Sequence, residues 1–121
     1  MYMTDAAILI PINDEHIDGK RDFHIWQQEE EGIETFRVPK FAPTDAPVAF
    51  WWAGVGIVAT GTVTGEVFRQ GDKNDRNFNR DVANIRFHRV FCSTPIYKRE
   101  LAAVVRPVPC YVDKKLLSGI L

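Results

Sequence analysis

The sequence has few of the features that mark secreted, metal-binding or membrane proteins. Its two cysteines, Cys92 and Cys110, fit neither a metal-ligand spacing nor a disulfide framework, so both are expected to be free thiols. The apolar run at residues 6–13 is far shorter than the roughly 20 residues that span a bilayer, and no basic leader precedes it. These absences predict a cytoplasmic protein that does not bind membranes.

The chain also lacks a strong excess of charge of either sign. With 15 basic and 16 acidic residues, its formal net charge is −1, which gives no overall attraction to nucleic acid. The charges are nevertheless unevenly placed. Residues 1–36 carry two basic and nine acidic side chains, whereas residues 69–99 carry eight basic and three acidic ones. The second segment is either a polyanion-binding face or an ordinary solvated surface.

Motifs for catalysis, metal binding and cofactor binding are missing as well. The sequence contains no Gly-x-Ser-x-Gly, no phosphate-binding P-loop and no dinucleotide fingerprint. His16, His24 and His88 do not form a metal-ligand motif, so each is interpreted as a surface or locally hydrogen-bonded histidine. The sequence therefore predicts no catalytic residue, no metal and no cofactor.

What is present is a pattern of short strands. The 121 residues, 45% hydrophobic and 26% charged, fit one compact domain over residues 1–121. β-Branched and aromatic residues punctuated by glycine favour two antiparallel strands at residues 48–53 and 56–67, joined through the sequence AGVG. Strand character returns over residues 82–91, and its alternating pattern slips near His88 as in a bulge.

The other segments are less regular. Residues 6–13 predict a buried first strand, and residues 14–31 predict at least one helix. Residues 32–48 contain Pro39, Pro43 and Pro47, too many for a helix or a central strand, and predict mostly loop. The polar residues 69–81 predict a long exposed loop.

Short helices are also expected in the sequences KRELAAVV and VDKKLLSGIL. Short strands dominate the whole pattern, and the first of them, at residues 6–13, lies far in the sequence from the strands that begin at residue 48. It predicts an α+β fold: a small, curved pseudo-barrel of five or six mostly antiparallel strands with flanking helices.

Two adjacent tryptophans, Trp51 and Trp52, raise a question of their own. Neighbouring side chains in a strand point to opposite faces, so both cannot enter the same core. Phe50 lies on the face of Trp52, which makes Trp52 the better candidate for the core. Trp51 is then expected to line a surface pocket beside Asn13, although each tryptophan taken alone is also compatible with a structural role.

The aromatic and basic residues also suggest a binding chemistry. A pocket for a planar base needs aromatic faces, a polar group that reads the edge of the base, and nearby cations for phosphates. The candidates for the base-binding pocket are Asn13, Trp26, Phe36, Trp51 and Trp52. The candidates for phosphate binding are Arg69, Lys73, Arg76 and Arg80.

Two segments, APVAFWWAGVGIVATGTVTGEV and VANIRFHRVFCSTPIYKREL, resemble the EVE domain of the PUA-like superfamily. The resemblance covers roughly residues 46–101. It lies in an aromatic-ended strand, a turn, a strand of the form GI-x-A-x-G-x-V, a variable loop and a strand leading into a P-I segment. It implies a PUA-like pseudo-barrel, related to YTH and ASCH domains, that binds DNA or RNA carrying a modified base flipped into an aromatic pocket.

The leading hypothesis is therefore a nucleic-acid-binding module without enzymatic activity. One alternative is a small ASCH-like hydrolase acting on a modified nucleoside, with Lys40, Thr44, Asp45 or Glu66 as acid–base groups. Another is a protein-interaction subunit in which an exposed tryptophan is an interface hot spot. Phosphate contacts predict binding that weakens steeply with salt, whereas an apolar protein interface does not.

Overall fold

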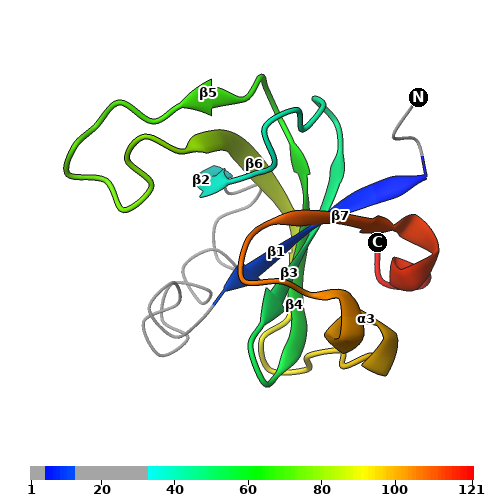
Figure 1. Ribbon diagram of the computed structural model, residues 1–121. Coiled ribbons are helices and arrows are strands. Elements are labelled where there is room, and N and C mark those ends of the chain that lie inside the picture. Colours follow the sequence, from blue (N-terminus) through cyan, green and yellow to red (C-terminus); the bar gives the residue numbers. More distant parts are fainter. Residues whose placement is uncertain (1–4, 13–32) are drawn as a thin grey trace.

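A single curled sheet accounts for most of the computed structural model (Figure 1), which describes residues 5–12 and 33–121. The helix expected in residues 14–31 lies outside these ranges. Within the described residues the sheet contains seven strands: β1 (Ala6–Ile12), β2 (Ile33–Arg37), β3 (Pro47–Trp52), β4 (Gly56–Val63), β5 (Phe68–Arg69), β6 (Asp81–Val90) and β7 (Cys110–Asp113). The described helical segments are α3 (Arg99–Val104) and the 3₁₀ turn η1 (Lys114–Leu117).

The strand order is β2-β6-β4-β3-β1-β7, and β5 pairs with the start of β6. β1 and β3 are parallel, whereas the other pairs are antiparallel. The sheet forms a curled half-barrel with few helices in the described part (Figure 1). The predicted curved, mostly antiparallel sheet is thus confirmed, with seven strands in the described residues in place of the five or six expected.

Ring contacts across the sheet demonstrate the curl. β2 and β3 are three strand spacings apart in the strand order, which is about 14 Å in a flat sheet. The ring centroids of Phe36 in β2 and Phe50 in β3 are nevertheless only 4.8 Å apart. Phe87 of β6 lies 5.2 Å from Phe50. These side chains therefore meet on the inside of the curl.

The strands expected at residues 48–53, 56–67 and 82–91 are confirmed as β3, β4 and β6. β3 and β4 form the expected antiparallel hairpin, closed by a hydrogen bond from the Val55 amide to the Trp52 carbonyl at 2.9 Å. β4 is shorter than expected, because it ends at Val63. The hairpin needs glycine at position 56, where φ is +127° and a Cβ atom would lie 2.5 Å from the Ile96 carbonyl oxygen.

The irregularity expected near His88 is confirmed as a β-bulge. Thr60 of β4 pairs with Arg89, but the next residue, Gly61, pairs with Phe87. His88 is thus the extra residue on β6. At this point the two backbones approach closely, since a Cβ atom on Gly61 would lie 2.5 Å from the Arg86 carbonyl oxygen.

Two strands at the ends of the sheet order, β2 and β7, were not predicted from the sequence. The prediction that residues 32–48 are mostly loop is wrong for residues 33–37, which form β2 before the first proline of that segment. β7 was not expected, and it pairs with β1 at the other end of the strand order. The helical turn expected in KRELAAVV is confirmed as α3, while the C-terminal segment forms only the short η1.

Apolar side chains pack on both faces of the central strands. The inner cluster, on the inside of the curl, includes alternate residues of β1 and β3, namely Ile8, Ile10, Ile12, Val48, Phe50 and Trp52. The outer cluster contains the intervening residues of the same two strands, namely Ala7, Leu9, Ala49 and Trp51. It is covered by Leu101 of α3 and by Leu117 and Ile120 of the C-terminal segment. The central strands are therefore buried on both sides.

Candidate nucleic-acid interface

A pocket of about 210 Å³ lies where the two ends of the curled sheet approach each other. One wall comes from the end of β2 and the turn after it, and another from the residues just before β7. The remainder comes from β5 and the start of β6. The lining residues of this cationic pocket are Arg37, Val38, Pro39, Lys40, Arg69, Arg80, Asp81, Val108 and Pro109.

Positive charge dominates the pocket. Four of its lining residues are basic and one, Asp81, is acidic. In the part of the chain that the structure describes, no hydrogen bond or ion pair ties the side chain of Arg37 or Arg80 to another residue. Because these guanidinium groups gather without matching carboxylates, the pocket suits an anionic ligand.

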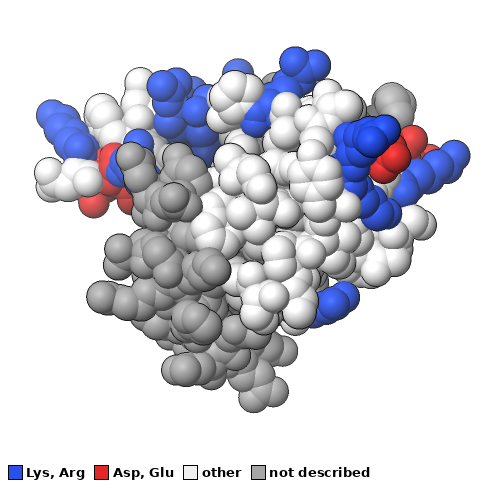
Figure 2. Space-filling view, turned by 90° about the horizontal axis from the view of Figure 1, so that it is seen from below, with Lys and Arg blue, Asp and Glu red and all other residues white. Residues whose placement is uncertain are grey.

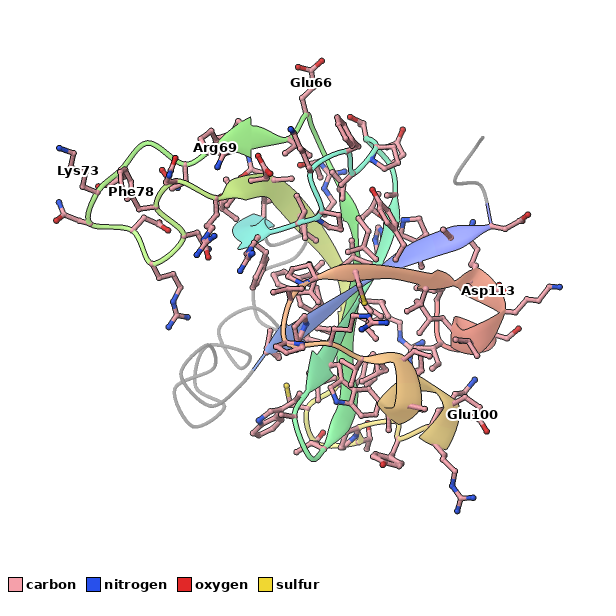
Figure 3. The ribbon with its side chains drawn as sticks, viewed as in Figure 1. Glu66, Arg69, Lys73, Phe78, Glu100 and Asp113 are labelled. Carbon is pink, nitrogen blue, oxygen red and sulfur yellow. The ribbon has the colours of Figure 1, made fainter. Side chains whose placement is uncertain are left out.

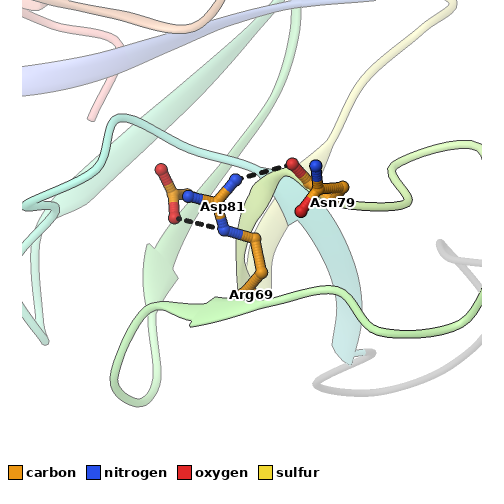
Figure 4. Close-up of polar contacts among 3 residues, drawn as sticks. All are labelled: Arg69, Asn79 and Asp81. Carbon is orange, nitrogen blue, oxygen red and sulfur yellow. Dashed lines mark hydrogen bonds and ion pairs between the residues drawn. The ribbon is translucent and has the colours of Figure 1, made fainter.

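Arg69 is held in a fixed position at the wall of the pocket (Figure 4). Its Nη1 donates to the Asn79 carbonyl oxygen at 2.6 Å, and its Nε lies 3.7 Å from Oδ1 of Asp81. The Arg69 side chain remains 56% exposed. The ion pair therefore orients Arg69 and partly neutralises it, while the guanidinium still faces solvent.

β5 and the start of β6 continue into an arm, residues 68–81, that extends away from the rest of the sheet (Figure 1). Gln70 and Arg80 pair across its base, with the Gln70 amide donating to the Arg80 carbonyl at 2.9 Å. Two aspartates shape the loop: Oδ1 of Asp72 accepts from the Asn74 amide, and Oδ1 of Asp75 accepts from the Asn77 amide. Asp72 and Asp75 thus stabilise turns of the loop through hydrogen bonds to backbone amides.

The four phosphate-binding candidates divide into two pairs. Arg69 and Arg80 line the cationic pocket. Lys73 lies at the outer part of the arm (Figure 3), and Arg76 is an exposed residue of the same loop. The structure therefore brings two of the four together and leaves the other two along the arm.

Sequence reasoning missed Arg37, and it considered Lys40 only as an acid–base group of the hydrolase alternative, not as a phosphate-binding residue. Both belong to the segment that was expected to be loop, and nothing in their local pattern distinguishes them from solvated residues. They enter the pocket because the curl brings the end of β2 beside Val108 and Pro109. This contact joins segments far apart in the sequence, so the local pattern of apolar residues cannot predict it.

The expected surface position of Trp51 is wrong. Trp51 is 4% exposed and packs in the outer cluster, with its ring centroid 5.4 Å from that of Tyr97. Trp52, at 8% exposed, packs in the inner cluster, as expected. The argument that the two rings cannot share one core holds, but each ring has a core of its own.

The other base-pocket candidates do not assemble into an open aromatic site in the described part. Phe36 is buried in the inner cluster, with its ring centroid 5.9 Å from that of Phe87. Asn13 and Trp26 lie outside the described residues, as do His16 and His24. The candidate aromatic residues that the structure describes, Phe36, Trp51 and Trp52, therefore pack in the hydrophobic core and do not line an open pocket.

The residues of the hydrolase alternative are also dispersed. Thr44 and Asp45 lie in an exposed turn, where Asp45 adopts φ of +70°. Glu66 projects into solvent at the opposite side of the sheet from α3 (Figure 3). Within residues 5–12 and 33–121, no three His, Cys, Asp or Glu side chains gather in a way that would hold a metal ion. His88 contacts Thr62, a residue of the neighbouring strand.

Both cysteines are free thiols, as expected. Cys92 is buried, and Cys110 follows the pocket residue Pro109 at the start of β7. Burial raises the pKa of the Cys110 thiol, and the positive charge of Arg106 partly opposes that rise. Burial also raises the pKa of the Tyr111 hydroxyl. Neither group is therefore prepared to act as a nucleophile near neutral pH.

Figure 2 shows how charge is distributed over one face of the molecule, seen from below. Lys and Arg side chains lie along the upper rim of this face, whereas its middle is uncharged.

The described chain contains no helix with the length and apolar character needed to cross a membrane. Comparison with family models, curated proteins and solved structures finds no match.

Proposed function

We propose that the chain is a nucleic-acid-binding module that holds backbone phosphates in the cationic pocket. The observation that carries this proposal is the gathering of Arg37, Lys40, Arg69 and Arg80 around one pocket with a single carboxylate among them. These residues come from separate parts of the sequence. A solvated surface would place basic residues beside acidic ones at no cost, so the accumulation of one sign favours an anionic ligand.

The size of the pocket supports a small anionic group. Sites that enclose drug-sized ligands occupy about 300–1,000 Å³, whereas this one occupies about 210 Å³. A phosphate with its oxygens accepting from guanidinium groups fits such a space, and arginine is the side chain that best matches phosphate geometry. A whole nucleotide would have to extend beyond it.

The arm favours nucleic acid over other polyanions. Phe68 and Phe78 are both exposed on it, and the exposed Lys73 and Arg76 lie between them in the sequence. Basic residues that track a backbone, together with exposed aromatic rings on which bases stack, are the usual means of binding single strands. A purely ionic ligand would give the rings no partner.

Recognition of a modified base is a further proposal with less support. The resemblance to the EVE domain implies it, as it implies a PUA-like fold. Since Phe36, Trp51 and Trp52 pack in the two cores, a base-specific pocket would depend on Asn13 and Trp26. We therefore place phosphate binding first and the reading of a modification second.

The experiment is a titration of labelled single-stranded and duplex oligonucleotides, with and without base modification, at several salt concentrations. We expect the logarithm of the binding constant to fall linearly with the logarithm of salt, by roughly 0.7 per phosphate contact on a single strand. Arg37→Gln should weaken binding and lower that slope by roughly 0.7. Arg99→Gln is the control, because this exposed arginine lies on α3, away from the pocket.

Three results bear on the proposal in different ways. A steep slope that Arg37→Gln reduces and Arg99→Gln leaves unchanged supports it. Equal loss in both variants would mean that only overall charge matters. Tighter binding of heparin than of any oligonucleotide would replace nucleic acid by another polyanion as the ligand.

A further inference from the structure

Phe41 stands beside the cationic pocket in an unusual state. It is 81% exposed, more than any other large hydrophobic side chain among the described residues. It follows the pocket residue Lys40, whose ammonium lies over the Phe41 ring at 5.5 Å from its centroid. An aromatic ring is therefore presented to solvent within reach of the pocket's charge.

The backbone around Phe41 holds the ring in this place. The Ala42 amide donates to the Pro39 carbonyl at 3.0 Å, which closes a turn with Lys40 and Phe41 at its tip. Val38, before the turn, and Ala42, after it, are both buried in the inner cluster. Because both ends are anchored and Pro39 restricts its own φ, the turn presents Phe41 outward as a built feature.

Packing within the chain does not explain this exposure. A phenylalanine in water forgoes the favourable burial that the neighbouring Ala42 and Val38 obtain. The pocket beside it accommodates a phosphate but is too small for a whole nucleotide, so a base attached to that phosphate must lie outside. The exposed ring of Phe41 adjoins the pocket residue Lys40, so it is available as a stacking partner for such a base.

We propose that Phe41 and the cationic pocket form one nucleotide subsite. The pocket holds a backbone phosphate, and an unpaired base of the same strand stacks on the Phe41 ring. This inference rests on the proposed function and adds a specificity to it. In a duplex, each base face is already stacked on its neighbours, so the subsite selects single-stranded over double-stranded nucleic acid.

The test compares four proteins: the wild type, Phe41→Ala, Phe41→Trp and the control Tyr97→Ala. Tyr97 is also an exposed aromatic residue, but it packs against Trp51 and does not line the pocket. Affinities are measured for a short single-stranded oligonucleotide and for the matching duplex at one salt concentration. Thermal unfolding of each variant reports on its folding.

We expect Phe41→Ala to weaken single-strand binding by roughly 5- to 150-fold, the range of one base–aromatic stack. Phe41→Trp should retain or strengthen it, and duplex binding should change little in either variant. Tyr97→Ala should bind both ligands like the wild type.

The outcomes separate this inference from the proposed function. Unchanged single-strand affinity in Phe41→Ala, together with a loss in Arg37→Gln, would overturn the stacking role and leave the function standing. Equal weakening of single strand and duplex in Phe41→Ala would also overturn the selectivity. A wild type that binds neither ligand would overturn the function and this inference together.

Discussion

Two aromatic positions ten residues apart, Phe41 and Trp51, differ sharply in their exposure to solvent. Trp51 belongs to the tryptophan pair that attracts attention in the sequence, yet it is 4% exposed and packs in the outer cluster. Phe41 is an ordinary residue of a proline-rich segment, yet it is 81% exposed and lies against Lys40 of the cationic pocket. An unusual sequence pattern here marks packing, whereas the proposed binding feature is an exposed ring next to a cationic pocket.

The physical reason lies in the covering of the sheet. A strand with one buried face must expose one of two adjacent tryptophans, but β3 has apolar clusters on both faces. Trp51 and Trp52 then each gain burial without any ligand. Phe41, by contrast, lies at the tip of a turn where no second layer covers it.

The largest effect that could break this comparison concerns the two tryptophans. Trp51→Ala and Trp52→Ala should each lower the free energy of unfolding by roughly 3–5 kcal/mol, because each removes a buried ring from a packed cluster. Chemical denaturation measures the change, and Phe41→Ala is the exposed control with almost no loss. If Trp51→Ala left stability intact and selectively lost nucleic-acid binding, Trp51 would line a ligand pocket after all.

A smaller effect is expected at the bulge between β4 and β6. Gly61→Ala should cost roughly 1–3 kcal/mol, because its Cβ would lie 2.5 Å from the Arg86 carbonyl oxygen and the strands would have to separate. Gly71→Ala, in the loop of the arm, meets nothing within 4 Å and should be close to neutral. Thermal unfolding of both variants checks the contrast, and equal melting temperatures would argue against the close approach of the two strands.

On the side of the pocket, removal of its carboxylate should strengthen binding. Asp81→Asn takes away one negative charge and frees Arg69 from its ion pair, so affinity for a single strand should rise about 2- to 5-fold, as for one charge near water. Stability should fall by no more than about 1 kcal/mol, since the pair is partly exposed. Weaker binding in Asp81→Asn would mean that the ion pair's orientation of Arg69 matters more than its charge.

The smallest expected effect concerns the reactivity of the two thiols, Cys110 and Cys92. Because burial raises the pKa of Cys110, its alkylation in the folded protein should be slower than in the unfolded chain near neutral pH and should accelerate as pH rises toward the raised pKa. The raised pKa also affects stability. It stabilises the folded state while the Cys110 thiol is protonated, and this contribution is lost as pH rises through the pKa of Cys110 in the folded protein. Peptide mass spectrometry distinguishes Cys110 from the buried Cys92; equal rates in folded and unfolded chains would contradict the shift.

Local patterns predicted the centre of the fold well. Alternation and glycine placement in β3, β4 and β6 identified these strands, their hairpin and the bulge at His88. β2 and β7 were missed because they are short strands at the two ends of the sheet order, where long-range pairing decides. Their edge positions cannot be derived from the residues of either segment alone.

The candidate site was predicted only in part for the same reason. Arg69 and Arg80 stood out because they lie in a basic segment, and both line the pocket. Arg37 and Lys40 join them through the curl of the sheet, which depends on contacts such as that between Phe36 and Phe50. The burial of Trp51 in the outer cluster likewise depends on α3 and the C-terminal segment, whose covering role no local pattern displays.

The central claim, that a nucleic acid binds at the cationic pocket, is tested most directly by mapping where it binds. Backbone amide resonances of the isotopically labelled protein would be followed by NMR as a short single-stranded oligonucleotide is added. We predict the largest shifts at Arg37, Phe41, Arg80 and Val108, with little change at Leu101 of α3. Shifts centred on α3 and Tyr97, with the pocket residues unchanged, would contradict the account.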